Sequence, residues 1–318
     1  MPKTVSVVIP VYNAQETIGK CLDSILGQDY GPVEIIAIND GSTDGSLAVL
    51  NGYAAANDSI VVIDTPNQGV SNTRNNAINI ATGDYLIFVD CDDYIDPDYV
   101  TTYMNQMDDN LDIIIGGWRR VDEQGKLMFE RSLHGSEWES YINVYAWSKL
   151  YRRDFLVKNG VQFLDYGIGE DMYFAFTTKA KGARVKIISY VGYTWTNNTA
   201  SVSNTSHKGL KQDLDVLYLL GKLNSLFDGK PELLRYYYRR FLVWWLLYSG
   251  RQATPTEFLT EHKRVMRWIS DNSVRTSLTP FSPRLSGEKP FERLSVFTFA
   301  VIERLHLLRL FALLYCKG

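Results

Sequence analysis

Clustered carboxylates stand directly after an apolar run in the N-terminal half of the chain. The run Tyr85–Val89 is followed by Asp90–Asp93, in which Asp90 and Asp92 are separated by one residue. On an extended segment such side chains point the same way, so both carboxylates can reach one ion. Carboxylates this close repel each other unless a proton or a cation screens them. Oxygen ligands suit Mg²⁺ or Mn²⁺, although a solvated acidic turn that caps the next helix explains the same residues.

A second polar edge follows two other apolar runs. Asp40 can accept a hydrogen bond from a base that presents an N–H, as a uracil imide does, and Tyr12 can stack on that base. The plainer interpretation is a turn at Asp40–Ser42 and a packing role for Tyr12. The sequence contains neither G-x-x-x-x-G-K-[ST] nor G-x-G-x-x-G after the first strand. This excludes a P-loop NTPase and a usual dinucleotide enzyme.

Alternating strands and helices must position these residues. Four short apolar runs are of strand type: Val5–Pro10, Val33–Ile38, Ile60–Ile63 and Tyr85–Val89. Amphipathic segments between them predict helices, the first opened by a capping box of Asn13 and Glu16 and the second capped within Ser42–Asp44. This alternation predicts a Rossmann-like open parallel sheet covered on both faces. Ligands of such sheets bind beyond the carboxyl ends of the strands, which is where the acidic residues fall.

The pattern changes along the second half of the chain. Asp112–Gly116 and Arg184–Tyr190 predict strands, Val121–Glu130 predicts a hairpin and Asp171–Ala180 predicts a helix. Beyond residue 208 helical periodicity dominates. We therefore predict an α/β domain over residues 1–228, with halves 1–97 and 98–228, and a helical C-terminal region over residues 229–318.

Composition narrows the class of protein. Hydrophobic residues make up 45% and charged residues 22% of the chain, as in ordinary globular proteins. The formal charge of −3 excludes a general nucleic-acid binder. The three cysteines form no C-x-x-C pair, which fits a reducing compartment. No run approaches the ~20 apolar residues of a membrane span. We therefore expect a cytoplasmic protein, with the inner face of the membrane as a second expected location.

Five motifs occur in an order that resembles the family 2 glycosyltransferases of bacterial type, which have a GT-A fold. They are Val8–Asn13, Asn39–Asp44, Asn67–Gly69 with Arg74-Asn75, Asp90–Asp93 and Gly169–Asp171. The resemblance implies a mostly parallel sheet of GT-A type. It also implies an inverting, metal-dependent transfer of a sugar from a nucleotide donor, most often a UDP-sugar. One departure is Thr73, which stands where many members have alanine before the arginine.

The resemblance also implies roles for single residues. Those implied to bind the nucleotide sugar are Pro10, Tyr12, Asn13, Asp40, Asn67, Arg74, Asp90, Cys91 and Lys149. Asp92 and Asp90 would hold Mn²⁺ or Mg²⁺, with His207 as a further ligand. Asp171 would be the catalytic base, and Glu170 beside it would raise its pKa by repulsion. Alternatively, Glu170 and Asp171 only form the acidic first turn of a helix.

Other residues keep two interpretations. Trp147 and Trp195 can stack on sugar faces or pack in the core. Lys149 can contact a diphosphate or lie on the surface. Arg119 and Arg120 can also contact a diphosphate, or they only flank a strand end. His207 can be an exposed loop residue.

The implied function is transfer of a hexose to a hydroxyl of a glycan acceptor, in the assembly of a surface polysaccharide or glycoprotein. The acceptor can be protein-bound, lipid-linked or a polysaccharide end. Two alternatives remain, a sugar-1-phosphate nucleotidyltransferase and a non-catalytic scaffold that binds a nucleotide sugar. The first has a Gly-rich phosphate loop after strand one, where this chain has Pro10–Asn13.

The helical C-terminal region is basic and apolar. Residues 231–318 contain 14 Lys and Arg against 7 Asp and Glu. We expect its helices to pack on the catalytic domain and to form a homodimer interface. A second interpretation is contact with an anionic membrane surface, and a third is binding of an acidic glycan.

Overall fold

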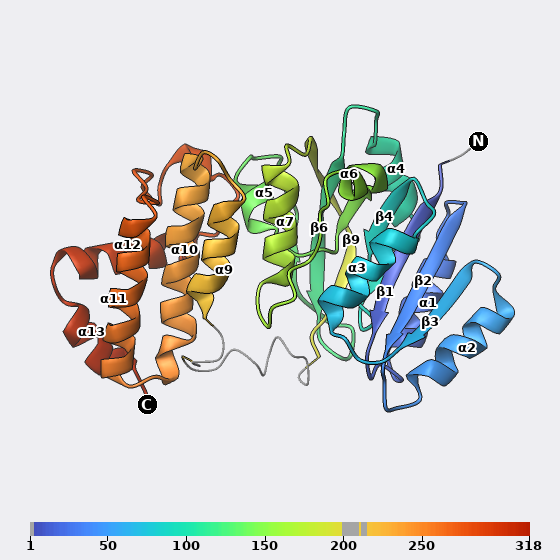
Figure 1. The fold of residues 1–318 in the computed structure, drawn as a ribbon, viewed down its shortest axis with the longest axis horizontal. Coiled ribbons are helices and arrows are strands. Elements are labelled where there is room, and N and C mark those ends of the chain that lie inside the picture. The colour runs from blue at the N-terminus through green and yellow to red at the C-terminus, as the bar shows by residue number, and fades with distance from the viewer. Residues whose placement is uncertain (1–2, 199–209, 211–214) are drawn as a thin grey trace. The chain divides into compact units, whose positions relative to one another are not determined.

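A computed structural model describes residues 3–198, 210 and 215–318 of the chain (Figure 1). Contacts between Cα atoms divide the chain into two compact units. The first contains residues 1–135 and 143–198, and the second contains residues 136–142 and 199–318. The division near residue 198 precedes the predicted boundary at residue 228. Helix α9 (Val216–Ser225) belongs to the second unit, where its Asn224 donates a hydrogen bond to Asn272.

The strands of the first unit form one mixed sheet. They are β1 (Val5–Val11), β2 (Val33–Asp40), β3 (Ile60–Thr65), β4 (Tyr85–Phe88), β5 (Tyr94–Ile95), β6 (Ile113–Val121), β7 (Leu127–Arg131), β8 (Lys149–Arg152) and β9 (Val185–Thr196). Their order is β3-β2-β1-β4-β8-β6-β9-β5, and β7 pairs with β6. The four strands β3, β2, β1 and β4 are parallel, as predicted. In the other half, β8 runs antiparallel to both β4 and β6, whereas β6 and β9 are parallel.

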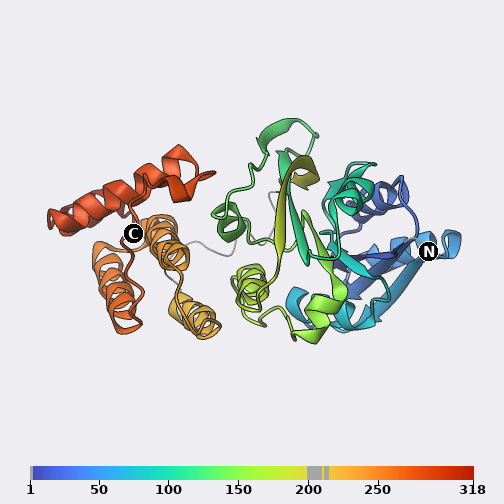
Figure 2. The same ribbon diagram turned by 90° about the horizontal axis from the view of Figure 1, so that it is seen from above.

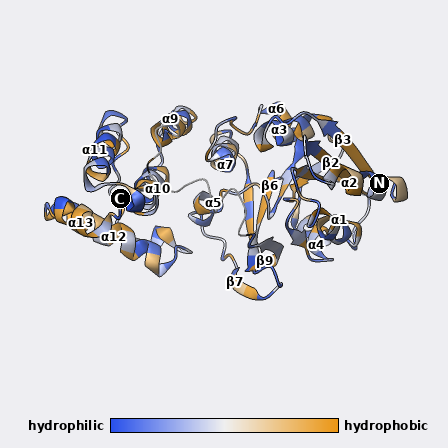
Figure 3. Cartoon of the chain, turned by 90° about the horizontal axis from the view of Figure 1, so that it is seen from below, coloured by the Kyte–Doolittle hydropathy of each residue, from blue (hydrophilic) through white to orange (hydrophobic). Residues whose placement is uncertain are grey.

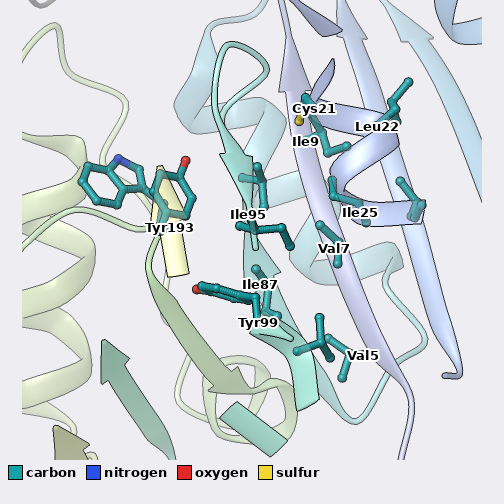
Figure 4. Packing of buried hydrophobic residues seen from close by; sticks show 14 of the residues in the cluster. Val5, Val7, Ile9, Cys21, Leu22, Ile25, Ile87, Ile95, Tyr99 and Tyr193 are labelled. Atoms are coloured by element: carbon teal, nitrogen blue, oxygen red, sulfur yellow. The ribbon is translucent and has the colours of Figure 1, made fainter. Parts of the chain in front are cut away.

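Helices cover both faces of this sheet. Those of the first unit are α1 (Ile18–Leu26), α2 (Ser46–Ala56), α3 (Val70–Ile80), α4 (Tyr99–Gln106), α6 (Arg153–Lys158) and α7 (Glu170–Ala180). Side chains alternate along a strand, so Val7 and Ile9 of β1 face the cluster under α1, α2 and α4 (Figure 4). Val8 faces the opposite cluster, which includes Phe174 of α7. The predicted α/β fold with a helical C-terminal region is therefore confirmed.

One of the two predicted helix starts differs from the structure. Helix α1 begins at Ile18, five positions after Asn13. The residue before the helix is Thr17, and its side chain forms no capping hydrogen bond. The Asn13 carboxamide oxygen instead accepts a hydrogen bond from the Thr43 backbone N–H at 2.8 Å. The capping-box prediction is wrong because this polar side chain joins two loops of the sheet edge. At the second start, Asp44 accepts from the Ser46 backbone N–H at 3.0 Å.

Substitution of Ile9 tests the packing of β1. Ile9 is fully buried, so Ile9→Val should lower the free energy of unfolding by about 0.5–1.5 kcal/mol. The same substitution at Ile80, which is 45% exposed on α3, should change it by less than about 0.5 kcal/mol. Urea unfolding measures both values, and equal losses would contradict the placement of Ile9 in the core.

The second unit is helical over its described residues. Besides α9 it contains α5 (Glu139–Ile142), α10 (Glu232–Tyr248), η1 (Gly250–Gln252), α11 (Pro255–Asp271), η2 (Pro283–Leu285), α12 (Pro290–Arg304) and α13 (Leu308–Tyr315). Figure 2 shows these helices from above, with the red C-terminal helices at the left. Trp138, just before α5, donates to Glu288 at 3.1 Å and packs against Tyr236 of α10. Within the described residues, no helix is long and apolar enough to cross a membrane.

Candidate active site

Loops at the carboxyl ends of β1 and β2 are tied together. Asn13, which has a φ of 49°, accepts from the Thr43 N–H and donates its own backbone N–H to the Ser42 hydroxyl oxygen at 3.0 Å. Pro10 is buried within β1, whereas the Tyr12 ring is 50% exposed. Of these predicted nucleotide-binding residues, Tyr12 therefore has a ring face available for stacking on a base.

Asp40 holds the next loop at the end of β2. Its two carboxylate oxygens accept hydrogen bonds from the backbone N–H groups of Gln68 at 2.8 Å and Gly69 at 3.0 Å. Each oxygen has a further lone pair, which a ligand could use only through the small part of Asp40, 4%, that is exposed. Gly41 has a φ of +68°, and a Cβ there would lie 2.6 Å from the Asn67 backbone nitrogen. The Asp-Gly pair thus lets Asn67, which is exposed, pass close to β2.

Arg74 of α3 bridges two carboxylates that are far apart in the sequence. Its side chain is buried, and its Nη2 and Nη1 atoms lie 2.6 Å from Asp90 Oδ1 and 2.9 Å from Asp171 Oδ1. The guanidinium also lies 5.3 Å from the centre of the Phe163 ring. The charges of Asp171 and Asp90 raise the Arg74 pKa against the effect of burial, which is the largest cause and lowers it. The resemblance implied that Arg74 binds the nucleotide sugar, and sequence reasoning missed this bridge to two carboxylates.

Asp171 lies in the first turn of α7, directly after Gly169 and Glu170. Besides the contact with Arg74, its Oδ2 accepts from the Ala146 backbone N–H at 3.1 Å. Burial raises the pKa of Asp171 to about 6; the Arg74 charge opposes the rise, and the charges of Glu170 and Asp90 add to it. Asp171 can therefore accept a proton near neutral pH, as a general base must.

With Asp171 as the predicted base of the implied sugar transfer, this pKa predicts a pH dependence of that reaction. A base must be deprotonated to act, so kcat/KM should fall about tenfold per pH unit below about pH 6 and level off above it. Glu170→Gln removes a neighbouring negative charge and should move the acid limb to lower pH. Initial rates in buffers of constant ionic strength measure both profiles. A rate that does not change between about pH 5 and pH 7 would show that Asp171 is not the base.

The acidic corner after β4 contains carboxylates in different surroundings. Asp93 is buried and accepts from the Tyr193 hydroxyl at 2.6 Å and the Thr196 backbone N–H at 2.8 Å. Its role is to hold the loop against β9. Asp92 is partly exposed, and burial followed by the charge of Asp90 raises its pKa to about 6. The negative charge of Asp92 is therefore destabilised by its surroundings, and a bound cation would stabilise it.

Asp90 and Asp92 fit the oxygen-ligand requirement of Mg²⁺ or Mn²⁺. Such ions are commonly held by one or two carboxylates together with substrate phosphates. Among the described residues there is no cluster of three or more His, Cys, Asp and Glu side chains arranged to hold a metal. The predicted ligand His207 lies outside the described residues. Cys91, between the two carboxylates, has a thiol whose pKa is raised by burial and by Asp92.

Lys149 is not the surface lysine that one interpretation expected. It opens β8, is 2% exposed, and its Nζ donates to the Tyr145 backbone oxygen. Burial lowers the pKa of Lys149 to about 7, and the charge of Asp171 opposes this shift. Lys149 thus belongs to the buried charges around Asp171, together with Arg74.

Aromatic rings pack around Lys149 and the acidic corner. Trp147 stacks between Tyr145 and Tyr193, with ring centres 3.9 Å and 4.6 Å away. Trp195 packs edge-on to Trp118 at 5.8 Å. The packing interpretation of Trp147 is confirmed, since its ring faces are covered. This cluster supports the site through Tyr193, whose hydroxyl oxygen also accepts from the Asp90 backbone N–H at 3.2 Å.

Arg119 likewise has a structural partner. It pairs with Asp96, at 3.0 Å from Nη1 to Oδ1, and also donates to the Val191 backbone oxygen. These contacts join β6 to the loop after β5.

Comparison with known proteins places this site in a family. The family model described as glycosyl transferase family 2 matches residues 6–167. The chain is 31% identical over 310 residues to the uncharacterized glycosyltransferase EpsJ of Bacillus subtilis, covering 90% of each chain. It is 32% identical over 189 residues to glycosyltransferase GlyA of Streptococcus pneumoniae, a match that covers 53% of this chain and 27% of GlyA.

A solved structure shares the fold. The crystal structure of residues 1–349 of S. aureus TarS, in complex with UDP-GlcNAc, superposes with a TM-score of 0.71 at 19% sequence identity. The match covers 95% of this chain and 92% of that one. It bears out the GT-A-type sheet that the motifs predicted.

Proposed function

The chain belongs to glycosyl transferase family 2, and from this membership we propose that it transfers a hexose from a UDP-sugar to a hydroxyl group of a glycan acceptor. The observation that carries the proposal is the bridge from Arg74 to Asp90 and Asp171. This bridge brings a carboxylate with a pKa of about 6 to the sheet edge where Asp90 follows β4. The proposed base, Asp171, and the proposed donor site after β4 then lie at the same edge of the sheet.

The donor class follows from the groups at the ends of β1 and β2. A uracil imide N–H can donate to Asp40, and the exposed ring of Tyr12 can stack on the base. Asn13, Asn67, Cys91 and Lys149 remain predicted contacts of the nucleotide sugar. That the structurally similar TarS was crystallised with UDP-GlcNAc supports a UDP-sugar in this crevice.

The proposed reaction is a single displacement. The acceptor oxygen attacks the anomeric carbon while Asp171 takes the proton of that hydroxyl group. The bond between the anomeric carbon and the diphosphate oxygen breaks, and its electron pair leaves with UDP. Attack opposite the departing group inverts the anomeric centre, so an α-linked donor gives a β-linked product. Arg74 orients Asp171 and restrains its pKa, so that the carboxylate remains ionised near neutral pH.

A divalent cation completes the proposed donor site. Asp92, with Asp90, would hold Mn²⁺ or Mg²⁺. When bound, the ion stabilises the negative charge that develops on the diphosphate. His207 is a further candidate ligand from the resemblance alone.

We further propose that the acceptor belongs to a surface polysaccharide or glycoprotein that is assembled on the cytoplasmic side. The acceptor's hydroxyl group is the only part of it that the proposed chemistry specifies. The homodimer interface on the apolar C-terminal helices stays a prediction from the sequence, and the exposed residues of these helices favour a different partner, as described below.

UDP release from a panel of UDP-sugars tests the function. The purified chain should release UDP in the presence of Mn²⁺ from at least one donor, slowly without acceptor and faster with a glycan that has the right hydroxyl group. The variant Glu170→Gln serves as a control in the same assay and should retain most of the UDP release. Binding of UDP-sugars without any UDP release would favour the non-catalytic scaffold.

The nucleotidyltransferase alternative is tested in the same reactions. That enzyme would form a nucleotide sugar and pyrophosphate from a sugar 1-phosphate and UTP. Pyrophosphate release from this pair, without transfer from any UDP-sugar, would replace the proposed function.

A further inference from the structure

The second unit exposes large apolar side chains on consecutive helices. On α12 they recur every three or four residues, so they share one face of the helix. On α13 they follow the same spacing, and orange segments mark both helices in Figure 3. We call the following residues the apolar face: Phe291, Leu294, Phe297, Val301, Leu305, Leu310, Leu313 and Leu314. Phe291 and Leu314 are 77% and 80% exposed, which is unusual for side chains of this kind.

A groove opens beside this face. It has a volume of about 770 Å³ and lies between α10 and the pair α12 and α13. Its lining includes Trp244 and Tyr248 of α10 and Phe291 and Leu294 of the apolar face. The rings of Trp244 and Tyr248 stack with their centres 5.2 Å apart, and both are 45% exposed. Half-exposed Trp and Tyr rings suit the boundary between water and hydrocarbon.

Positive charge borders the apolar face. Arg304, Arg309 and Lys317 are exposed, and within the described part of the chain none of them forms an ion pair. The acidic residues of α12 are neutralised from α10, because Glu292 pairs with Arg240 and Glu303 pairs with Arg239. The outer surface of α12 and α13 is thus apolar and basic, with its acids paired to α10.

We propose that the apolar face docks on the surface of an anionic phospholipid bilayer, with the groove receiving acyl chains. A helix with Phe and Leu on one side and basic residues beside them lies in the plane of such a surface. Anionic head groups attract each basic residue near them. A symmetric dimer through this face would instead place two copies of the same basic surface against each other, which electrostatic complementarity opposes. The charge pattern therefore favours the membrane over a second copy.

Vesicle co-sedimentation tests the proposal with three variants of the full chain. The wild-type protein should sediment with vesicles of phosphatidylcholine and phosphatidylglycerol, and much less with phosphatidylcholine alone. Leu310→Glu with Leu314→Glu should abolish the binding, and both side chains are exposed enough to leave folding unchanged. Arg304→Gln with Arg309→Gln should weaken it about 30-fold, or about fivefold for each charge.

The control removes the same charge elsewhere. Lys263→Gln with Arg267→Gln changes two exposed residues of α11 and should retain nearly all the binding. Release of UDP in solution should be the same in all variants, so failure of this proposal is separate from failure of the proposed function. Equal sedimentation with both vesicle types would overturn the proposal. It would also be overturned by a lipid-free dimer that Leu310→Glu with Leu314→Glu dissociates, without vesicle binding by the wild type.

Discussion

Asp171→Asn should lower the rate of sugar transfer by about 10²–10⁴-fold, which is the usual contribution of a general base. An amide cannot take the proton of the acceptor hydroxyl at neutral pH. The side chain keeps its size, so the dissociation constant of the UDP-sugar should remain close to that of the wild type. Rates of UDP release with acceptor measure the loss, and calorimetric titration with the donor measures binding.

Glu170→Gln is the matched control for this prediction. It makes the same chemical change one residue earlier in the first turn of α7 and should retain most of the activity. Thermal unfolding should show that Asp171→Asn lowers the free energy of unfolding by about 1–3 kcal/mol. The amide cannot accept hydrogen bonds from both Arg74 and the Ala146 backbone as the carboxylate does. Full transfer activity in Asp171→Asn would remove Asp171 from the role of base.

Arg74→Met should lower the free energy of unfolding by about 3–5 kcal/mol, as expected when one partner of a buried ion pair is removed. The carboxylates of Asp90 and Asp171, whose side chains are 29% and 22% exposed, would then repel each other without the positive charge that bridges them. Transfer should also fall, and its acid limb should move to higher pH, because the Arg74 charge holds the Asp171 pKa down. Urea unfolding and the pH dependence of kcat/KM measure the two effects.

Arg74→Lys separates charge from geometry. An ammonium group keeps the positive charge, but it lacks the planar fork with which the guanidinium donates to two carboxylates. We expect intermediate stability and an acid limb between those of Arg74→Met and the wild type. An unchanged acid limb in Arg74→Met would contradict electrostatic restraint of Asp171 by Arg74, even if the variant is less stable.

The strand ends could be predicted from the sequence because each follows a short apolar run. Parallel strands place their carboxyl ends at one edge, so Asp40 and Asp90 were expected to lie in the same crevice. The local pattern of apolar runs was sufficient to predict these strand ends. The resemblance added Asp171, which the structure joins to Asp90 through Arg74.

Long-range contacts set the limit of that reasoning. The bridge from Arg74 to Asp171 spans 97 positions of sequence, and no local periodicity encodes it. The burial of Lys149 depends on the β8 strand and on aromatic packing that includes Tyr145. Asn13 matches a helix-capping pattern, but the structure uses it to join the loops after β1 and β2, since Thr43 offers its N–H there.

The second unit shows a similar limit. Its residues 136–142 come from the middle of the sheet-forming sequence, so a boundary drawn by composition alone could not include them. Trp138 is fully buried against Tyr236, a contact between positions that only the folded chain brings together.

UDP release after chelation tests the proposed donor site most directly. The wild-type enzyme, its UDP-sugar and its acceptor are measured after exhaustive treatment with EDTA and again after Mn²⁺ is restored, alongside Asp92→Asn. Binding of Mn²⁺ in the presence of UDP is followed separately by electron paramagnetic resonance. We predict that chelation stops transfer, that Mn²⁺ restores it in the wild type, and that Asp92→Asn neither binds the ion tightly nor recovers. Transfer at the full rate after chelation, or in Asp92→Asn, would contradict the proposed donor site.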